Sequence, residues 1–333
     1  MRYLRTIIRS SAYAATAALV AFGLSPTSGL TQDYPRRPIR FIVGFGPGGV
    51  VDLMARSLGQ KLTEAWGQQV IIDNRPGAGG VVCMQIAGKA APDGYTLLLG
   101  SSAQFSIAPG LRPDLPYDPI RDYTPIVYAA LSPIILTVHP SHPARSLQEL
   151  IKLAKARSPQ TASYASTGYG AVPHITAELF KRVADIDITH IPYKGGSDAM
   201  IALMGGQIPM SFGAVSTSLP HIRATRLRSL GVTSLKRLTA APDVPTFVEG
   251  GLPGFEVVQW FGVFGPAHMP SPLVRKLNET LNRALAVPQF NEHFAAQGIE
   301  LQHTTPAEFA RYVNAELVRW KRTLKELGIK EAP

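Results

Sequence analysis

FIVGFGPGGVVDLMAR, residues 41 to 56, decides the fold of this chain. An apolar run typical of a buried strand leads into a Gly-Pro-Gly-Gly turn, and a helical pattern that contains Asp52 follows at once. Such a unit leaves several backbone N–H groups unpaired at the positive end of a helix, where an anion is stabilised. A tight turn without a ligand explains the same letters equally well. A phosphate-binding nucleotide loop explains them poorly, because its Gly-Lys-Ser/Thr is missing.

Short aliphatic or β-branched runs alternate with amphipathic helical patterns along the rest of the chain. This alternation predicts a mostly parallel α/β architecture. Strands are predicted at residues 39–44, 69–73, 96–101, 133–139, 161–166, 188–193, 208–213, 227–233 and 257–265. Helices are predicted from apolar stripes that begin near Met54, Leu147, Ile175, Val274 and Phe309.

The length of 333 residues and the hydrophobic fraction of 45% suit two lobes, each with its own core. The long apolar segment 124–139, interrupted at Pro133, suits a crossing from one lobe to the other, and 227–233 suits the return crossing. We therefore predict one lobe from residues 33–130 plus 231–333, and a second lobe from residues 131–230.

Residues 1–30 have the pattern of a secretory signal peptide. Arg2, Arg5 and Arg9 form a basic start, and an apolar, alanine-rich run follows. This run is short for a membrane-spanning helix, which needs about 20 residues. The sequence therefore predicts export and cleavage. An uncleaved membrane anchor is the less favoured alternative, which stays open because no A-x-A cleavage site is present.

The net charge of +10 favours anionic ligands. Lys and Arg are scattered and form no basic patch interleaved with aromatic residues, so nucleic-acid binding is not predicted. The single cysteine, Cys83, excludes an intramolecular disulfide and a cysteine-based zinc site. Histidines form no HExxH or HxH pair. No metal and no cofactor are predicted.

Three further loops rich in glycine or hydroxyl groups follow predicted strands. They are residues 165–180 (ASTGYGAVPHITAELF), the strand end Gly100-Ser101-Ser102, and residues 192–200 (PYKGGSDAM). In a doubly wound sheet the carboxyl ends of the strands border one crevice, where ligands bind. Hydroxyl and free N–H groups favour a carboxylate over a cation in such a crevice.

A secreted hydrolase that acts on a small carboxylate substrate is the alternative function, because serine, histidine and aspartate are all available. No Gly-x-Ser-x-Gly elbow surrounds Ser101, Ser102 or Ser166. His174 stands at the start of a helix, where a capping or packing role is favoured over that of a catalytic base. The chain is therefore predicted not to be an enzyme.

Several ordered blocks carry a family resemblance over nearly the whole exported chain. They are YPRRPIRFIVGFGPGGVVDLMAR, VIIDNRPGAGGVVCMQIAGKAAPDGYTLLLG, LPYDPIRDYTPI, ASTGYGAVPH, HIPYKGGSDAMIALMGGQI, APDVPTFVEGGLPGFE and WFGVFGP. With these blocks the chain resembles the Bug family, the periplasmic substrate-binding proteins of tripartite tricarboxylate transporters.

The resemblance implies a type II periplasmic-binding-protein fold, in which two lobes, each a mostly parallel sheet flanked by helices, are hinged around a central cleft. It implies that the protein captures a small carboxylate-bearing organic acid in the periplasm, such as a di- or tricarboxylate, an aromatic acid or an amino acid. The acid would then pass to the membrane permease subunits of the transporter. A monomer is expected.

The resemblance also implies the residues that hold the ligand carboxylate, partly through ordered water. They are Phe45, Gly48, Gly49 and Asp52 on one lobe, Ser166, Thr167, Gly168 and His174 on the other, and Ser101 and Ser102 on a third loop. Family members commonly carry an acidic residue where this chain has Pro209. Asp198 is the residue expected to compensate for that loss.

Overall fold

The computed structural model describes residues 34–47, 50–77, 80–112 and 114–329. The predicted signal peptide and the predicted site residues Gly48 and Gly49 lie outside these ranges. The chain divides into two compact units, with the boundary between Arg36 and Arg37. The sheet and its helices belong to the unit that begins at Arg37.

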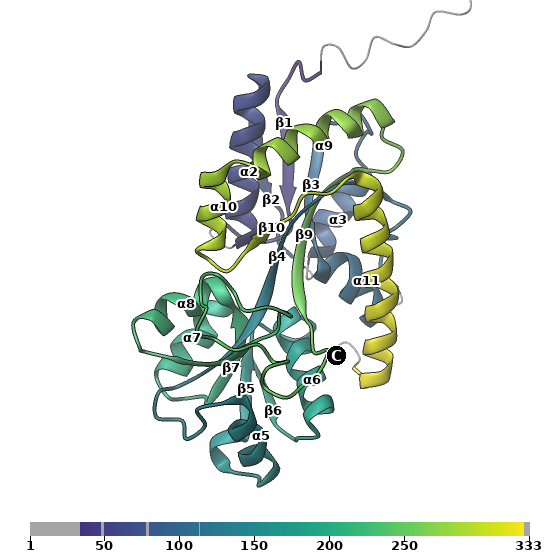
Figure 1. Ribbon diagram of the computed structural model, residues 1–333. Helices are drawn as coiled ribbons and strands as arrows, with labels where there is room; N and C mark the ends of the chain where they lie inside the picture. The colour runs from purple at the N-terminus through teal and green to yellow at the C-terminus, as the bar shows by residue number, and fades with distance from the viewer. Residues whose placement is uncertain (1–33, 48–49, 78–79, 113, 330–333) are drawn as a thin grey trace, which may run out of the picture. The chain divides into compact units, whose positions relative to one another are not determined.

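A sheet of ten strands, counted over the described residues, forms the centre of this unit (Figure 1). The strands follow the order β2-β1-β3-β9-β4-β7-β5-β6, and β8 and β10 also pair with β4. β1 is parallel to β2 and β3, and β5 is parallel to β6 and β7. The bounds are β1 Ile39–Val43, β2 Val70–Asn74, β3 Thr96–Ser101, β4 Tyr123–Val138, β5 Ser163–Ser166, β6 Thr189–Pro192, β7 Met210–Ala214, β8 Arg228–Val232, β9 Val258–Pro266 and β10 Glu300–Leu301.

β4 joins the two halves of the sheet. Its residues from Tyr123 to Pro133 pair with β9, and its residues from Ile134 to Val138 pair with β7 and β8. The change of partner falls at Pro133, which has no N–H to offer a ladder. Half-sheet A is the part on the β9 side of this change (β2, β1, β3, β9, β10 and the start of β4). Half-sheet B is the rest (the end of β4, β7, β5, β6 and β8).

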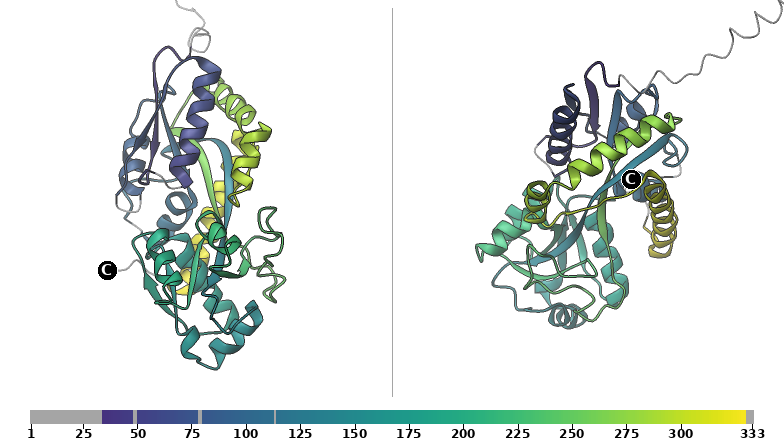
Figure 2. Two further views of the ribbon diagram at one scale, coloured as in Figure 1. Left: turned by 90° about the vertical axis from the view of Figure 1, so that its left-hand side faces the viewer. Right: turned by 45° about the horizontal axis from the view of Figure 1, so that its top comes forward.

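Helices cover both faces of half-sheet A (Figures 1 and 2). α2 (Val50–Trp66) packs on β2 and β1 and against α9 (Ser271–Leu285). On the other face, α3 (Val81–Gly88) and the first part of α11 (Pro306–Leu327) share a core with Ile42 and Leu98. β1, β3 and β9 are mostly buried between these layers, as expected for strands covered on both faces, whereas the edge strand β2 is partly exposed and carries Asp73 and Asn74.

Half-sheet B is covered in the same way. α5 (Leu147–Lys155) and α6 (Val172–Ala184) pack in the cluster that contains Leu136. α8 (Val215–Arg223) packs in the cluster that contains Ile135, and α7 (Gly196–Met204) lies beside it. Ile135 and Leu136 are neighbours on β4 and point to opposite faces, so these two pairs of helices lie on opposite sides of the sheet.

Several short elements were not predicted from the sequence. They are the π-helical turn η2 (Ala103–Ile107), which runs into α4 (Ala108–Leu111), the 3-10 turn η3 (Pro159–Thr161), the helix α10 (Pro288–Ala295) and β10. Among these elements η2 and α4 matter most, because they bring small and apolar side chains to the carboxyl end of β3.

α11 belongs to two cores. Near its start Phe309 and Val313 pack with Trp260 of β9, in the core of half-sheet A. Near its end Trp320 and Leu324 lie in the core of half-sheet B. The helix begins with the capping box of Thr305 and Glu308 that such a sequence predicts.

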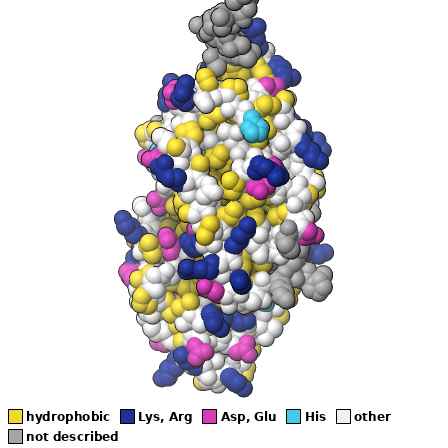
Figure 3. Space-filling model, turned by 90° about the vertical axis from the view of Figure 1, so that its right-hand side faces the viewer, with side chains coloured by type: hydrophobic (Ala, Val, Ile, Leu, Met, Phe, Trp, Pro, Cys, Tyr) yellow, Lys and Arg dark blue, Asp and Glu magenta, His cyan; other side chains and the backbone are white. Residues whose placement is uncertain are grey.

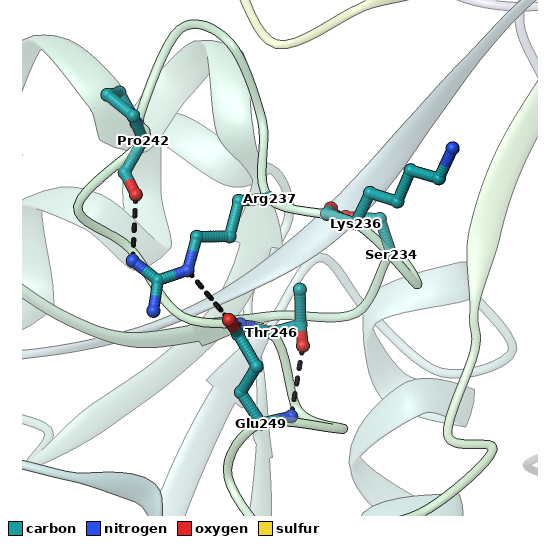
Figure 4. Close-up of polar contacts among 6 residues, drawn as sticks. All are labelled: Ser234, Lys236, Arg237, Pro242, Thr246 and Glu249. Atoms are coloured by element: carbon teal, nitrogen blue, oxygen red, sulfur yellow. Dashed lines mark hydrogen bonds and ion pairs between the residues drawn. The ribbon is translucent and has the colours of Figure 1, made fainter.

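The connection from β8 to β9 is held by an ion pair outside and by aromatic side chains inside. Arg237 Nε donates to both carboxylate oxygens of Glu249, at 3.0 and 2.9 Å, and an Arg237 Nη1–H donates to the carbonyl of Pro242 (Figure 4). The guanidinium of Arg237 lowers the pKa of Glu249 from its usual value. Phe247 and Phe255 of the same connection pack into the core of half-sheet B.

Charges of both signs are mixed on the surface. On the face seen in Figure 3, Lys and Arg side chains lie among Asp and Glu side chains, and hydrophobic side chains gather at mid-height. Within the described residues no helix has the length and apolar character needed to cross a membrane.

Candidate functional site

A cavity of about 520 Å³ lies between the two half-sheets. Half-sheet A and its helices contribute Phe45, Val81, Ala103, Ala108, Leu111, Arg112 and Gln259, and half-sheet B with its loops contributes Thr167, Tyr169, Gly170, Ala171, Val172, Pro173, Lys194, Gly195 and Ala214. The volume lies in the range of small-molecule sites. The residues come from both predicted lobes.

Three helices of half-sheet B begin at this cavity. The residues that precede their first turns are Ala171 for α6, Gly195 for α7 and Ala214 for α8, and all three line the cavity. None of the three accepts a capping hydrogen bond with its side chain. The first N–H groups of each helix are therefore left to water or to a ligand, at the positive end of the helix dipole.

The sheet explains why the three helix ends converge. β5, β6 and β7 run parallel, so their carboxyl ends lie at one edge of half-sheet B. Each of these strands leads into one of the helices: β5 into α6, β6 into α7, and β7 into α8. The edge thus combines three sets of N–H groups, which is an arrangement that stabilises an anion.

Polar side chains in the lining support the same chemistry. The side chains of Thr167, Lys194 and Gln259 make no hydrogen bond or ion pair within the described part of the chain, so their polar groups are open to a ligand. No Asp or Glu is found among the described lining residues, whereas Arg112 and Lys194 are cationic. The electrostatic potential of the cavity therefore favours a negative charge.

Two histidines whose rings are tilted by 32° to one another lie behind the loop that follows β5. The rings of His174 and His190 have centroids 4.2 Å apart. His190 Nε2 lies 2.7 Å from the hydroxyl of Ser166, and the N–H of Gly170 donates to His174 Nδ1 at 3.2 Å. Burial, together with the neighbouring His174, lowers the pKa of His190 to about 4. Burial also lowers the pKa of His174. Both rings are therefore neutral at pH 7.

The predicted residues Ser166 and His174 are buried and do not line the cavity. The hydroxyl of Ser166 accepts from the N–H of Gly168, whose φ of 113° suits glycine. Ser166, Gly168 and His174 thus hold the backbone of the loop in place. Thr167, between the first two, is the residue of the group that reaches the cavity.

Asp52 also lies behind a loop. Its side chain is 2% exposed and accepts from Asn74 Nδ2 at 2.9 Å and from Arg56 Nε at 2.9 Å. The same Asn74 amide donates to the carbonyl of Phe45 at 3.0 Å. Asp52 therefore fixes Asn74, and Asn74 fixes the backbone at Phe45, which lines the cavity.

Replacing Asp52 by alanine is expected to lower the free energy of unfolding by about 1–3 kcal/mol, because the change leaves the amide of Asn74 without its buried acceptor. Urea unfolding measures this loss. Glu64→Ala is the matched control on α2, because Glu64 makes exposed contacts with Lys61 and Gln60 and such surface contacts contribute about 0–1 kcal/mol. Equal stability of the two variants would contradict the role given to Asp52.

Ser101 and Ser102 are buried at the end of β3 and do not line the cavity. Both the N–H and the hydroxyl of Ser101 donate to Gln104 Oε1 at 2.9 Å. Gln104 Nε2 in turn contacts the sulfur of Cys83, whose pKa is raised by burial to about 12. Cys83, which is fully buried, is therefore a packing residue. The cavity side of this turn is Ala103.

Asp198 and Pro209 are not among the described lining residues. Asp198 is exposed in the first turn of α7. Pro209 precedes the first residue of β7, whereas Ala214, the last residue of β7, lines the cavity. A strand of this length places the two ends about 15 Å apart. An acidic side chain at position 209 would therefore lie at the edge of half-sheet B that faces away from the cavity.

Another hollow, of about 560 Å³, lies at the far end of α6. Its charged lining residues are Lys155, Arg157, Lys181 and Arg182, with Glu178, Asp185 and Asp187. The two signs of charge offset each other there, and no helix begins at it. Across the described ranges, no group of three or more His, Cys, Asp or Glu is arranged to hold a metal ion.

Sequence reasoning missed most of the lining. Ala171 and Ala214 carry no motif, and Tyr169 and Lys194 stand inside loops that were singled out without naming them. One signal was available: helices that follow strands directly and lack Ser, Thr, Asp or Asn at the capping position. Leu111 could not be found in this way, because α4 itself was not predicted.

Comparison with known proteins identifies the relatives of the chain. A UPF0065 protein in the tcbD-tcbE intergenic region of Pseudomonas sp. (strain P51) is 38% identical over 294 residues, which are 88% of this chain and 87% of that protein. Protein BugT of Bordetella pertussis is 37% identical over 319 residues, which are 96% of each chain.

Solved structures agree. A protein of R. palustris with adipate is 32% identical, with a TM-score of 0.82 over 90% of this chain and 99% of that chain. The periplasmic binding protein BugD is 32% identical, with a TM-score of 0.79 over 90% of this chain and 100% of that chain. The predicted fold class, a periplasmic-binding-protein fold of two α/β lobes, is confirmed.

The family model described as "Tripartite tricarboxylate transporter family receptor" matches residues 54–329. This match covers half-sheet B, half-sheet A apart from β1, and every described lining residue of the cavity except Phe45. The predicted resemblance is therefore confirmed, and the chain belongs to the tripartite tricarboxylate transporter receptor family.

Proposed function

We propose that the protein is a periplasmic solute-binding protein that captures a small carboxylate-bearing organic acid for a transporter of the tripartite tricarboxylate type. One observation carries the proposal: three uncapped helix N-termini meet at one cavity whose described lining holds no acidic side chain. Adipate in the related R. palustris structure is a ligand of this chemistry.

The carboxylate would accept hydrogen bonds from the first turns of α6, α7 and α8. Thr167 would add a hydroxyl donor and Lys194 a positive charge. From the other side, the loop at Phe45 and the adjoining Gly48 and Gly49 would complete the contact. Asp52, Ser166, Gly168 and His174 would act through the loops that they hold, and the same holds for Ser101 and Ser102 behind Ala103.

We also propose that the two lobes close on the ligand. Lobe 1 would contain residues 33–130 and 231–333, and lobe 2 would contain residues 131–230. The packing of Phe247 and Phe255 on half-sheet B supports extending lobe 2 to about residue 257. An acid that contacts both lobes favours the closed state, because it adds contacts that the open state lacks.

The remaining parts of the proposal concern location and partners. Residues 1–30 would direct export to the periplasm, and the partner would be the permease subunits in the membrane. The mixed charges in Figure 3 support a protein that does not bind nucleic acid. We propose that the protein acts as a monomer and without a cofactor.

Ser166 and His190 form a pair that a hydrolase could use, so the non-enzymatic role needs an argument. His190 Nδ1 is buried and has no hydrogen-bond partner among the described residues, so no carboxylate orients the ring. A serine and a histidine without a carboxylate that orients the histidine lack the arrangement of a catalytic triad. Neither side chain lines the cavity. These features support binding without turnover.

A ligand panel tests the proposal. The exported chain is heated with dicarboxylates, tricarboxylates, aromatic acids and amino acids, and the unfolding transition is followed. At one hundred times the dissociation constant, a cognate acid is expected to stabilise the folded state by about 2.7 kcal/mol. The corresponding primary amides, which lack the charge, are the matched controls and are expected to have no effect.

A panel in which no acid shifts the transition would contradict the proposal. Product formation by the parent protein, lost in Ser166→Ala, would support the hydrolase instead. Unchanged ligand after hours of incubation, recovered by mass spectrometry, is the result that binding without turnover predicts.

A further inference from the structure

We infer that the cognate ligand is an acid whose body, beyond its bound carboxylate, is apolar, and that this body lies against half-sheet A. The inference rests on the proposed function, because it assumes that a carboxylate is held at the three helix ends. It concerns the other end of the ligand, and it comes from the difference between the two walls of the cavity.

The wall from half-sheet A is apolar. Phe45, Val81, Ala103, Ala108 and Leu111 line it, and none of their side chains can donate or accept a hydrogen bond. All five are partly accessible, so their surface is available to a ligand. We call these five residues the apolar wall. Polar side chains in this part of the described lining are those of Arg112 and Gln259.

The position of the positive charges fixes the direction in which the acid lies. Lys194 and the uncapped starts of α6, α7 and α8 are on half-sheet B, whereas half-sheet A brings one such start, that of α3 at Val81. Arg112, at the end of α4, already interacts with other groups of the protein. The carboxylate is therefore held at half-sheet B, and the rest of the molecule extends toward the apolar wall.

The apolar wall discriminates against hydroxyl groups. A hydroxyl that is pressed against it gives up water and gains no partner, which weakens binding by about 5- to 100-fold per hydroxyl. Each methylene buried there strengthens binding about fourfold. Sugar acids and hydroxylated tricarboxylates are thus disfavoured relative to aliphatic or aromatic acids of the same size.

Two pairs of acids that differ only in hydroxyl groups test the inference. Adipate and galactarate share a six-carbon dicarboxylate chain, and cyclohexanecarboxylate and quinate share a ring with one carboxylate. Calorimetric titration of the exported chain is expected to show that the unsubstituted member of at least one pair binds at least about 100-fold more tightly than its hydroxylated partner. The two pairs together distinguish a dicarboxylate from a monocarboxylate ligand.

The outcomes separate the inference from the proposed function. A hydroxylated acid that binds as tightly as its unsubstituted partner overturns the inference and leaves the proposed function standing. If no acid of these pairs or of the wider panel binds, the proposed function fails, and the inference fails with it.

A pair of variants places the effect at the apolar wall. Val81→Thr keeps the shape of the side chain and adds a hydroxyl to the wall, whereas Val82→Thr makes the same change at a neighbour that is 38% exposed and outside the lining. Val81→Thr is expected to weaken the binding of the unsubstituted acid about fivefold and to spare its hydroxylated partner. Equal affinities in the two variants would overturn the placement.

Discussion

Ala214→Asp is expected to abolish ligand binding while it raises the stability of the protein. Ala214 is the capping position of α8 and lines the cavity, and its side chain caps nothing. An aspartate there accepts from the free N–H groups of the first turn and stabilises the helix by about 0.5–2 kcal/mol. The same carboxylate occupies the place of the ligand and repels it, so affinity should fall at least about 100-fold. Thermal unfolding and titration measure the two effects.

Two controls separate charge, capping and position. Val287→Asp places the same residue at the uncapped start of α10, outside the lining, and should leave affinity unchanged. Ala214→Asn caps α8 without a charge, so it should stabilise the protein and reduce affinity less than aspartate does. If Ala214→Asp binds the acid as the parent does, the ligand is not held at the N-terminus of α8.

His190→Gln is expected to make folding less sensitive to acid. The pKa of His190 is about 4 in the folded protein against 6.5 in the unfolded chain, because burial and His174 disfavour the charged ring. Between these two pH values the unfolded chain takes up a proton that the folded protein does not, so stability falls as the pH falls. The loss reaches at most about 3 kcal/mol at pH 4 and does not grow below it.

Urea unfolding at pH 7 and at pH 4 measures this loss in the parent and in the variant. Several groups act on the ring of His190: His174 and Lys181 lower its pKa, and Glu178 raises it. The rings of Tyr164 and Tyr169 pack against it. All of them are retained in the variant, so the difference between the two proteins isolates His190. His303→Gln, at an exposed histidine, is the control that should keep the parent profile. Identical pH dependence of parent and His190→Gln would refute the assignment.

Local sequence predicted the strands that are bounded by clear turns. β1 and β3 begin where the aliphatic runs begin, and they end within a residue of the prediction. The start of β4 was predicted as a crossing and not as a strand, because Pro133 interrupts the run. The structure accommodates Pro133 and also Pro125: the partner strand changes at Pro133, and the register with β9 shifts just after Pro125. Such adjustments depend on the neighbouring strand, which local sequence does not reveal.

The return crossing was predicted at residues 227–233, which contain β8. Among the described residues β8 pairs with the end of β4, in half-sheet B. β9 lies along the first part of β4 instead. Both segments are apolar and of suitable length, so composition could not choose between them. The choice follows from the long connection held by Arg237 and Glu249, whose aromatic residues pack on half-sheet B.

The candidate site was predicted in part. Glycine-rich loops after strands pointed to Phe45 and Thr167, which line the cavity. They pointed equally to Asp52 and Ser166, whose side chains turn inward to hold the same loops. Motif and orientation are different properties: a motif shows which loop is special, and only packing shows which side chain of the loop faces the cavity.

The proposed capture of the carboxylate by the first turns of α6, α7 and α8 has a consequence for evolution. Backbone N–H groups are present whatever the side chain, except at proline, so most mutations leave the recognition of the acid group intact. Substitutions at the apolar wall are then free to change which acid is preferred. A lineage built on this arrangement can acquire new nutrients through drift at a few wall positions, without passing through a form that binds nothing.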